Sequence, residues 1–240
     1  EKDKEIEQRL KLRIVPVTFT ARKFGLEGTN AARIAFTRFP DIQAHKRLKD
    51  LIQYPYGCLE QTVSAAFPQL YIGNILDLST VSKQMVTDNV NDAIRKISSF
   101  QVDDGFTLWP VSSWYRGEKN WWVSDYVGHF LLEAKAAGYH VPDQLYNHWL
   151  ASCRSGAKRV DKSNHRYQTY CLFLLAQSGK ADQGAMNMVR ENYLRDLDPL
   201  SRKMLAAAYF LSGQKDAATK IDQAVFTEIT TYREMAGTFG

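Results

Sequence analysis

From about residue 40 onward, the apolar residues of this chain recur with the period of an α-helix. In the stretch 81–100, one helical face carries Met85, Val86, Val90, Ile94 and Ile97. The same pattern predicts further helices over residues 42–54, 61–75, 121–137, 142–152, 167–178, 182–194, 200–211 and 215–225. Short turns containing glycine, proline or aspartate separate these stretches. We therefore expect successive helical hairpins that bury their inner faces, and no parallel α/β sheet.

The first forty residues follow a different pattern. Residues 10–20 and 31–39 alternate partly between apolar and polar positions and are rich in β-branched residues, with a glycine-containing turn between them. They predict two β-strands, the first at a sheet edge because it contains Pro16. A lone hairpin is marginally stable, so these strands are expected to belong to a larger sheet. The predicted organisation is a β segment over residues 1–40 and a helical domain over residues 41–240.

Composition narrows the possible functions. The net charge of +5 is small for 240 residues, and the basic residues are scattered, which does not favour a nucleic-acid partner. No apolar run is long enough for a membrane helix. The N-terminus is charged and unlike a secretory signal, although a signal could have been removed. The three cysteines, Cys58, Cys153 and Cys171, lack zinc-motif spacing, so no metal or cofactor is predicted. A Cys153–Cys171 bridge and separate thiols both stay open.

Cys58 differs from the other cysteines because of its neighbours. It precedes a predicted helix, whose positive N-terminal end favours a thiolate. Gln61 lies three residues further on, so the two side chains can face each other in the first helical turn. A thiolate beside an amide carbonyl can attack it, expel ammonia and leave an internal thioester. The surroundings that would bend the chain and exclude water are Tyr54, Tyr56, Gly57, Leu59 and Glu60.

A cysteine and a glutamine at this spacing occur often by chance, and the longer string around them is more specific. Residues 54–62 read Tyr-Pro-Tyr-Gly-Cys-Leu-Glu-Gln-Thr, and residues 67–71 read Phe-Pro-Gln-Leu-Tyr. This string resembles the thioester region of the α2-macroglobulin and complement family. It is more similar to the bacterial members, because animal members tend to have glycine where Leu59 stands. The resemblance runs from about Pro40 to the end of the chain.

The resemblance implies a fold and a mode of action. The family's thioester domain is an α/α toroid of helical hairpins inserted into a CUB-like β-sandwich, which would account for the β segment at residues 1–40. Fewer helices are expected here than a complete ring requires, which leaves open a truncation at the C-terminus. The family traps proteases. After cleavage of a bait region elsewhere in the parent chain, a lysine amine of the protease would attack the acyl carbon of Gln61 and release Cys58.

Several further expectations follow from the resemblance. The trap is used once, so the chain is not expected to be a turnover enzyme or to have catalytic residues, a cofactor or a small-molecule substrate. Its expected partners are target proteases and other domains of the same parent chain. Its expected location is the periplasm, the cell envelope or the exterior, as for bacterial relatives.

Three other functions have weaker support in the residues. Helical toroids also host glycosidases and cyclases, but Asp103–Asp104 is the only adjacent acidic pair of note, and it lies in a predicted turn. A cysteine hydrolase needs a histidine base near Cys58, and none is close in sequence. A scaffold that has lost its thioester would not need both reactive residues. Family members that label hydroxyl groups carry a histidine in a segment that looks shortened here, between His148 and His165, so we expect amines to be preferred.

Overall fold

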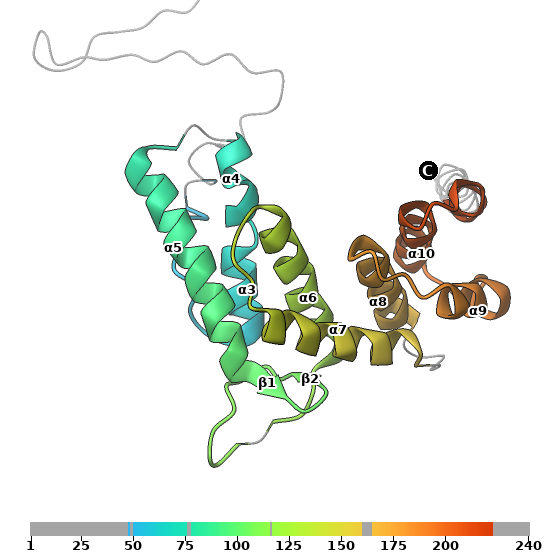
Figure 1. Ribbon diagram of the computed structural model, residues 1–240, viewed down its shortest axis with the longest axis horizontal. Helices are drawn as coiled ribbons and strands as arrows, with labels where there is room; N and C mark the ends of the chain where they lie inside the picture. Colours follow the sequence, from blue (N-terminus) through green and yellow to red (C-terminus); the bar gives the residue numbers. More distant parts are fainter. Residues whose placement is uncertain (1–47, 49, 76–77, 116, 160–164, 223–240) are drawn as a thin grey trace, which may run out of the picture. The chain divides into compact units, whose positions relative to one another are not determined.

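The computed structural model describes residues 48, 50–75, 78–115, 117–159 and 165–222 (Figure 1). Within these residues the protein is mainly α-helical. The expected β segment at residues 1–40 lies outside them, so that segment and the domain boundary stay predictions. The elements are α3 (Leu59–Ala66), α4 (Gln69–Ile75), α5 (Thr80–Ile97), a 3-10 turn (Ser98–Phe100), β1 (Gln101–Val102), β2 (Gly105–Phe106), α6 (Trp121–Ala136), α7 (Asp143–Ala157), α8 (His165–Gln177), α9 (Gln183–Tyr193) and α10 (Pro199–Leu211).

Local sequence signals explain where most helices begin and end. The side-chain oxygens of Ser79, Asn120, Asp182 and Asp198 accept backbone N–H groups in the first turns of α5, α6, α9 and α10. These bonds satisfy donors that have no partner inside the helix. The turns after α6, α8 and α10 each contain a glycine at positive φ, a conformation that other residues adopt at a cost. The helices predicted from these signals are therefore confirmed to within a few residues.

Two local expectations were wrong. Residues 50–56 form a turn and an extended segment, although a helix was predicted as far as residue 54. Pro55 disfavours helical geometry at the residue before it. Helix α7 continues to Ala157, five residues past its predicted end. The predicted turn at Asp103–Asp104 is confirmed, and it belongs to a small antiparallel hairpin in which Gln101 pairs with Phe106. Asp103 and Asp104 form its two-residue loop.

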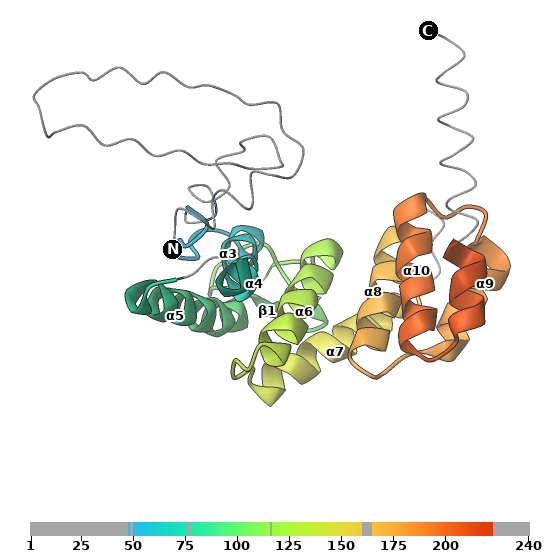
Figure 2. The ribbon, with the colours of Figure 1, turned by 90° about the horizontal axis from the view of Figure 1, so that it is seen from above.

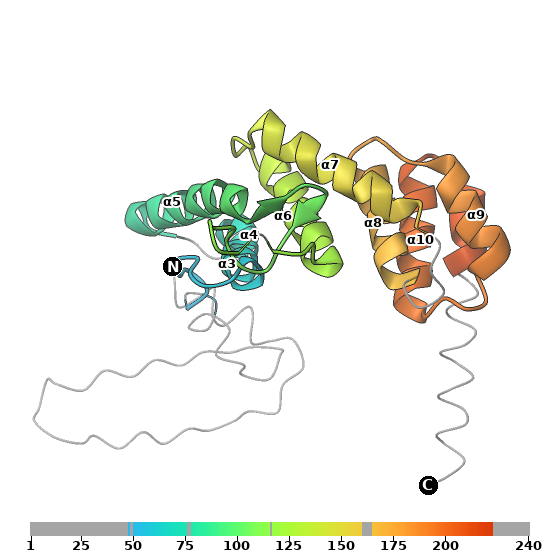
Figure 3. The same ribbon diagram turned by 90° about the horizontal axis from the view of Figure 1, so that it is seen from below.

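Helix α6 is the central element of the core. It packs against α3 and α5 on the N-terminal side and against α7 and α8 on the C-terminal side, and α8 in turn packs against α10. Figure 2 and Figure 3 show this succession from α3–α5 through α6 and α7 to α8–α10. The largest fully buried side chains are Trp149, Tyr209, Phe106 and Phe130. Apolar burial of this kind is the main stabilising contribution to such a fold.

A close helix crossing fixes α6 against α7. A Cβ at Gly128 of α6 would overlap the indole Nε1 of Trp149 on α7, so only glycine admits the indole at this point. Trp149 is fully buried, whereas Trp109 and Trp114 are 57% and 98% exposed. Among the described residues, no helix has both the length and the apolar composition needed to cross a membrane.

Candidate functional site

The candidate site lies at the start of α3, where Cys58 is the N-cap residue. Its backbone is extended (φ −66°, ψ 172°), and its carbonyl oxygen accepts the first helical hydrogen bond, from Thr62 N at 2.9 Å. The N–H of Leu59, which has no helical partner, donates to the carbonyl oxygen of Leu108 at 2.9 Å. Glu60 is an acidic residue in the first turn, where the helix dipole favours negative charge. The structure thus places Cys58 at a helix N-terminus, as its sequence context predicts.

Gln61 folds back over Cys58. The side-chain oxygen Oε1 of Gln61 accepts a hydrogen bond from the backbone N–H of Cys58 at 3.1 Å. Gly57 makes this possible in two ways. Its φ of +91° is a left-handed conformation that other residues adopt only at an energetic cost. A Cβ at this position would also overlap Gln61 Oε1 and lie 3.0 Å from Gln61 Cδ. A glycine is therefore needed both for the bend and for the return of the glutamine side chain.

A lysine from α5 holds the segment that leads into the site. Lys96 Nζ donates to the carbonyl oxygen of Pro55 at 2.7 Å and lies 4.1 Å from the ring centre of Tyr54. The ring of Tyr56 is also within cation–π range, with its centre 5.2 Å from the same nitrogen, and the two tyrosine rings contact each other. Lys96 is forty residues away in sequence, so the spacing around Cys58 gave no signal for it.

A buried amide pair anchors the other end of this segment. Gln69 on α4 is 1% exposed, and its Nε2 donates to the carbonyl oxygen of Gln53 at 2.7 Å. Its Oε1 accepts from Nδ2 of Asn89 on α5 at 3.0 Å. Buried amides without partners are costly, so this chain of bonds fixes the segment to two helices.

An open groove of about 420 Å³ lies beside Gln61, lined by Gln53, Tyr54, Tyr56, Gly57, Gln61, Ser64 and Ala65. Tyr54 and Tyr56 are 38% and 73% exposed, whereas Leu59 is fully buried beneath the helix start. Of the three apolar side chains expected to exclude water, only Leu59 is thus covered by the described residues themselves. The two tyrosines present aromatic surface to the groove.

The histidines and the acidic pair considered from the sequence make structural contacts or are exposed. His148 Nε2 is 2.9 Å from the carbonyl oxygen of Gly105, and His165 packs against the ring of Tyr193. Asp103 and Asp104 are exposed in the hairpin turn. Among the described residues, no recorded hydrogen bond joins Cys58 to a histidine, so the pairing that a cysteine hydrolase needs is not formed here.

His129 and Glu133 of α6 belong to a polar network that also includes Tyr71 of α4 and Tyr170 of α8. His129 Nδ1 lies 2.9 Å from the hydroxyl of Tyr170, and Tyr71 donates to Glu133 at 2.6 Å. Burial lowers the pKa of His129, and burial together with Glu133 raises the pKa of Tyr71 to about 12. The contacts of His129 with Tyr170 and with the ring of Phe67 place it within the helix packing.

The start of α3 brings the backbone of Cys58 and the side chain of Gln61 together. One helix start presents a thiol and an amide carbonyl, and the backbone N–H of Cys58 already donates to the carbonyl oxygen of Gln61. A donor on that oxygen would stabilise the negative charge that develops there when a nucleophile attacks Cδ. A mainly helical domain with such a cysteine–glutamine pair is of the thioester-domain class.

Comparison with known proteins agrees with this class. The sequence model of the A-macroglobulin TED domain matches residues 37–164, and the chain belongs to that family. The α2-macroglobulin of Escherichia coli K12 is 29% identical over 210 residues, which cover 81% of this chain and 12% of that protein. The described fold is accordingly that of the family's domain, an α/α toroid.

Two solved structures resemble the chain in fold. The crystal structure of Salmonella α2-macroglobulin reacted with methylamine matches with a TM-score of 0.64 and 26% identity, over 76% of this chain and 13% of that one. The crystal structure of trypsin-activated E. coli α2-macroglobulin matches with a TM-score of 0.63 and 26% identity, over 72% and 13%. The chain therefore spans about an eighth of the length of these relatives.

Proposed function

We propose that Cys58 and Gln61 form an internal thioester, and that the chain is the covalent capture domain of a protease-trapping inhibitor. The observation that carries the proposal is the bond from the Cys58 N–H to Gln61 Oε1, 3.1 Å long and formed over a glycine that has no room for a Cβ. Family membership supports the same assignment.

Bond formation follows from this arrangement. The Cys58 sulfur attacks Cδ of Gln61, and the carbonyl oxygen becomes an oxyanion that accepts a hydrogen bond from the backbone N–H of Cys58. The C–N bond then breaks, ammonia leaves with the thiol proton, and an Sγ–Cδ bond remains. In serine hydrolases, one donor of this kind changes the rate by about 100- to 1,000-fold.

Capture reverses the roles of the two residues. A lysine amine attacks Cδ, the same N–H stabilises the oxyanion, and the Cδ–Sγ bond breaks with Cys58 leaving as thiolate. The product is an amide between Gln61 and the lysine. The thioester is consumed, so each site acts once. The tyrosines beside the groove suit an arriving ammonium group, because cations are attracted to aromatic faces.

Two relatives support an amine and a protease as reactants, because one was solved after reaction with methylamine and the other after activation by trypsin. The bait region, the parent chain's other domains and an envelope location belong to the same proposal. Preference for amines over hydroxyls is expected because the histidine-bearing segment looks shortened and because His148 and His165, which flank it, have structural partners.

The test uses the full-length protein that carries these residues. Incubation with trypsin should give conjugates that survive boiling in detergent. A Cys58→Ala variant should still be cleaved by trypsin but should give none. Trypsin whose lysines have been dimethylated keeps its active site and lacks acylatable primary amines, so it should cleave without being conjugated. Equal conjugation of native and dimethylated trypsin, or no conjugation of either, would refute the proposal.

A further inference from the structure

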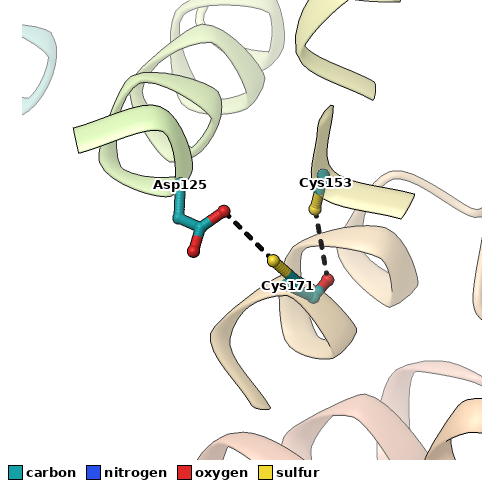
Figure 4. Close-up of side chains that lie close together, drawn as sticks. All are labelled: Asp125, Cys153 and Cys171. Atoms are coloured by element: carbon teal, nitrogen blue, oxygen red, sulfur yellow. Dashed lines mark hydrogen bonds between the residues drawn. The ribbon is translucent and has the colours of Figure 1, made fainter. Parts of the chain in front are cut away.

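Three chemically reactive side chains meet in the core, away from the candidate thioester site. Asp125 on α6, Cys153 on α7 and Cys171 on α8 are 2%, 1% and 1% exposed. One carboxylate oxygen and the two sulfur atoms all lie within 4.8 Å of one another. Figure 4 shows the carboxylate of Asp125 and both sulfurs directed into the same space between three helices. None of the chemistry at Cys58 uses this cluster.

The hydrogen bonds inside the cluster leave it incompletely satisfied. The thiol of Cys171 donates to Asp125 Oδ1 at 3.1 Å, and the thiol of Cys153 donates to the carbonyl oxygen of Cys171 at 3.4 Å (Figure 4). The second carboxylate oxygen, Asp125 Oδ2, is buried and has no hydrogen-bond partner within the described residues. Burial raises the pKa of Asp125 to about 7. A buried carboxyl group with one unsatisfied oxygen normally has a ligand or a water to bind.

A buried lysine beside the cluster supplies a second observation. The side chain of Lys119 is 5% exposed, and its Nζ lies 3.4 Å from the ring centre of Trp121. Within the described residues this nitrogen makes no hydrogen bond, and its ion pair with Asp104 is long, at 3.8 Å. Burial lowers the pKa of Lys119, while the charge of Asp104 and, after it, those of Asp125 and both cysteines act to raise it. A lysine in this position is compensated best when the cluster carries negative charge.

We propose that Asp125, Cys153 and Cys171 form a zinc-binding site in the core. Thiolate sulfur and carboxylate oxygen are both zinc ligands, and zinc in proteins prefers four donors in a tetrahedron. The two sulfurs supply two of these donors, and Asp125 supplies the third, because its two oxygens lie too close together to occupy separate corners. A water molecule would take the fourth corner. Binding Zn²⁺ displaces the protons of both thiols and of any protonated carboxyl group. The resulting complex has one net negative charge, which the ammonium of Lys119 balances.

The geometry requires only a small contraction. In a tetrahedral site with Zn–S bonds of about 2.3 Å, the two sulfurs lie about 3.8 Å apart. The present upper limit of 4.8 Å is about 1 Å larger. Gly156 gives Cys171 room to adjust, since a Cβ there would lie 2.6 Å from the sulfur.

The main competing state is a disulfide between Cys153 and Cys171. Oxidation would remove the thiol of Cys171, which among the described residues is the only hydrogen-bond donor to Asp125. The carboxyl group would then be buried with neither oxygen paired, which costs about 1–3 kcal/mol for a neutral group and more for a charged one. Metal binding instead gives the carboxylate a partner, so the residues around the thiols favour zinc.

The experiment uses the full-length protein, kept reduced and stripped of metal with a chelator. The wild type should bind one more Zn²⁺ per chain than variants that lack these ligands. Co²⁺ bound in place of Zn²⁺ should give thiolate-to-cobalt charge-transfer absorption. Cys153→Ser should weaken this binding by more than 100-fold. Asp125→Asn, which keeps the side-chain shape, and Lys119→Met should weaken it by about 10- to 100-fold. Cys58→Ser is the matched control and should bind as the wild type does.

Any one of three outcomes would overturn the zinc-site proposal. Absence of thiolate-to-cobalt absorption in the reduced wild type would exclude the site without reliance on any variant. Cobalt absorption that persists in the Cys153→Ser variant and is lost in Cys58→Ser would place the metal at the candidate thioester cysteine. Alkylation of the freshly isolated, unfolded protein that labels neither Cys153 nor Cys171 until a reductant is added would show a disulfide. Folding of each variant is checked by its helical circular dichroism.

Discussion

Replacement of Gly57 by alanine separates the chemical role of this residue from its backbone role. Gly57 and Gly138 have nearly the same φ, +91° and +89°, so alanine should strain both positions similarly, by about 1–2 kcal/mol. The two sites differ in their surroundings. A Cβ at Gly57 would overlap Gln61 Oε1, whereas nothing lies within 4 Å of a Cβ at Gly138. Gly138→Ala is therefore a control with the same backbone strain and no contact at the site.

The expected effect on thioester formation follows from the displaced glutamine. Moving Gln61 away from the Cys58 N–H removes a hydrogen bond worth about 1 kcal/mol in the folded protein. It also removes the donor from the oxyanion during attack, which corresponds to about 100- to 1,000-fold in rate. We expect Gly57→Ala to form little or no thioester, while Gly138→Ala forms as much as the wild type. Both variants should lose a similar amount of stability, with Gly57→Ala slightly less stable.

The assay counts the thiols released by methylamine from freshly purified full-length protein, and peptide mapping locates the methylamide. Denaturant unfolding measures the stability of both variants. If Gly57→Ala released as much thiol as Gly138→Ala, the close approach of Gln61 to residue 57 would have no part in the chemistry. If both variants lost the thioester equally, backbone strain alone would explain the effect.

Three further predictions concern the surroundings of the site and the core. Lys96→Met should release the aromatic segment before Cys58, so water should hydrolyse the thioester several-fold faster, as measured by the appearance of free thiol. The control Lys83→Met, at an exposed lysine, should leave the hydrolysis rate unchanged. Gly128→Ala would overlap a buried indole and should destabilise the fold by about 3 kcal/mol or more in denaturant unfolding, while Gly184→Ala in α9, which has ordinary contacts, should be neutral or stabilising. Burial lowers the pKa of His129, so its contribution to stability is present above about pH 6.5 and is lost as pH falls toward the folded pKa. His129→Gln should reduce the loss of unfolding free energy between pH 7 and pH 5, and an unchanged slope would contradict this.

The sequence predicted the helices well because their signals are local. Apolar spacing, an N-cap residue and a glycine at positive φ act within a few residues. An N-cap side chain is present at α5, α6, α9 and α10, and a glycine at positive φ follows α6, α8 and α10. The extension of α7 to Ala157 could not be read in this way. Gly156 usually weakens a helix, but here the sulfur of Cys171 occupies the space where a side chain would lie.

The candidate site was partly predictable for the same reason. The Cys58–Gln61 spacing and the need for Gly57 follow from one helical turn. The contribution of Lys96 depends on how α5 packs, and the bond from Leu59 N to the Leu108 carbonyl oxygen depends on a loop fifty residues away. The meeting of Asp125 with two cysteines also depends on packing, because three separate helices supply the residues. Contacts of this kind leave no periodic trace in the sequence.

The central claim is most directly tested by the intact mass of freshly purified full-length protein before and after methylamine treatment. The account predicts a mass lower than that of the unmodified chain by one ammonia. Methylamine should then restore a mass consistent with one added amine, release one thiol at Cys58 and leave a methylamide at Gln61. A protein with the full unmodified mass and a freely alkylated Cys58, and no methylamide at Gln61 after treatment, would contradict the account.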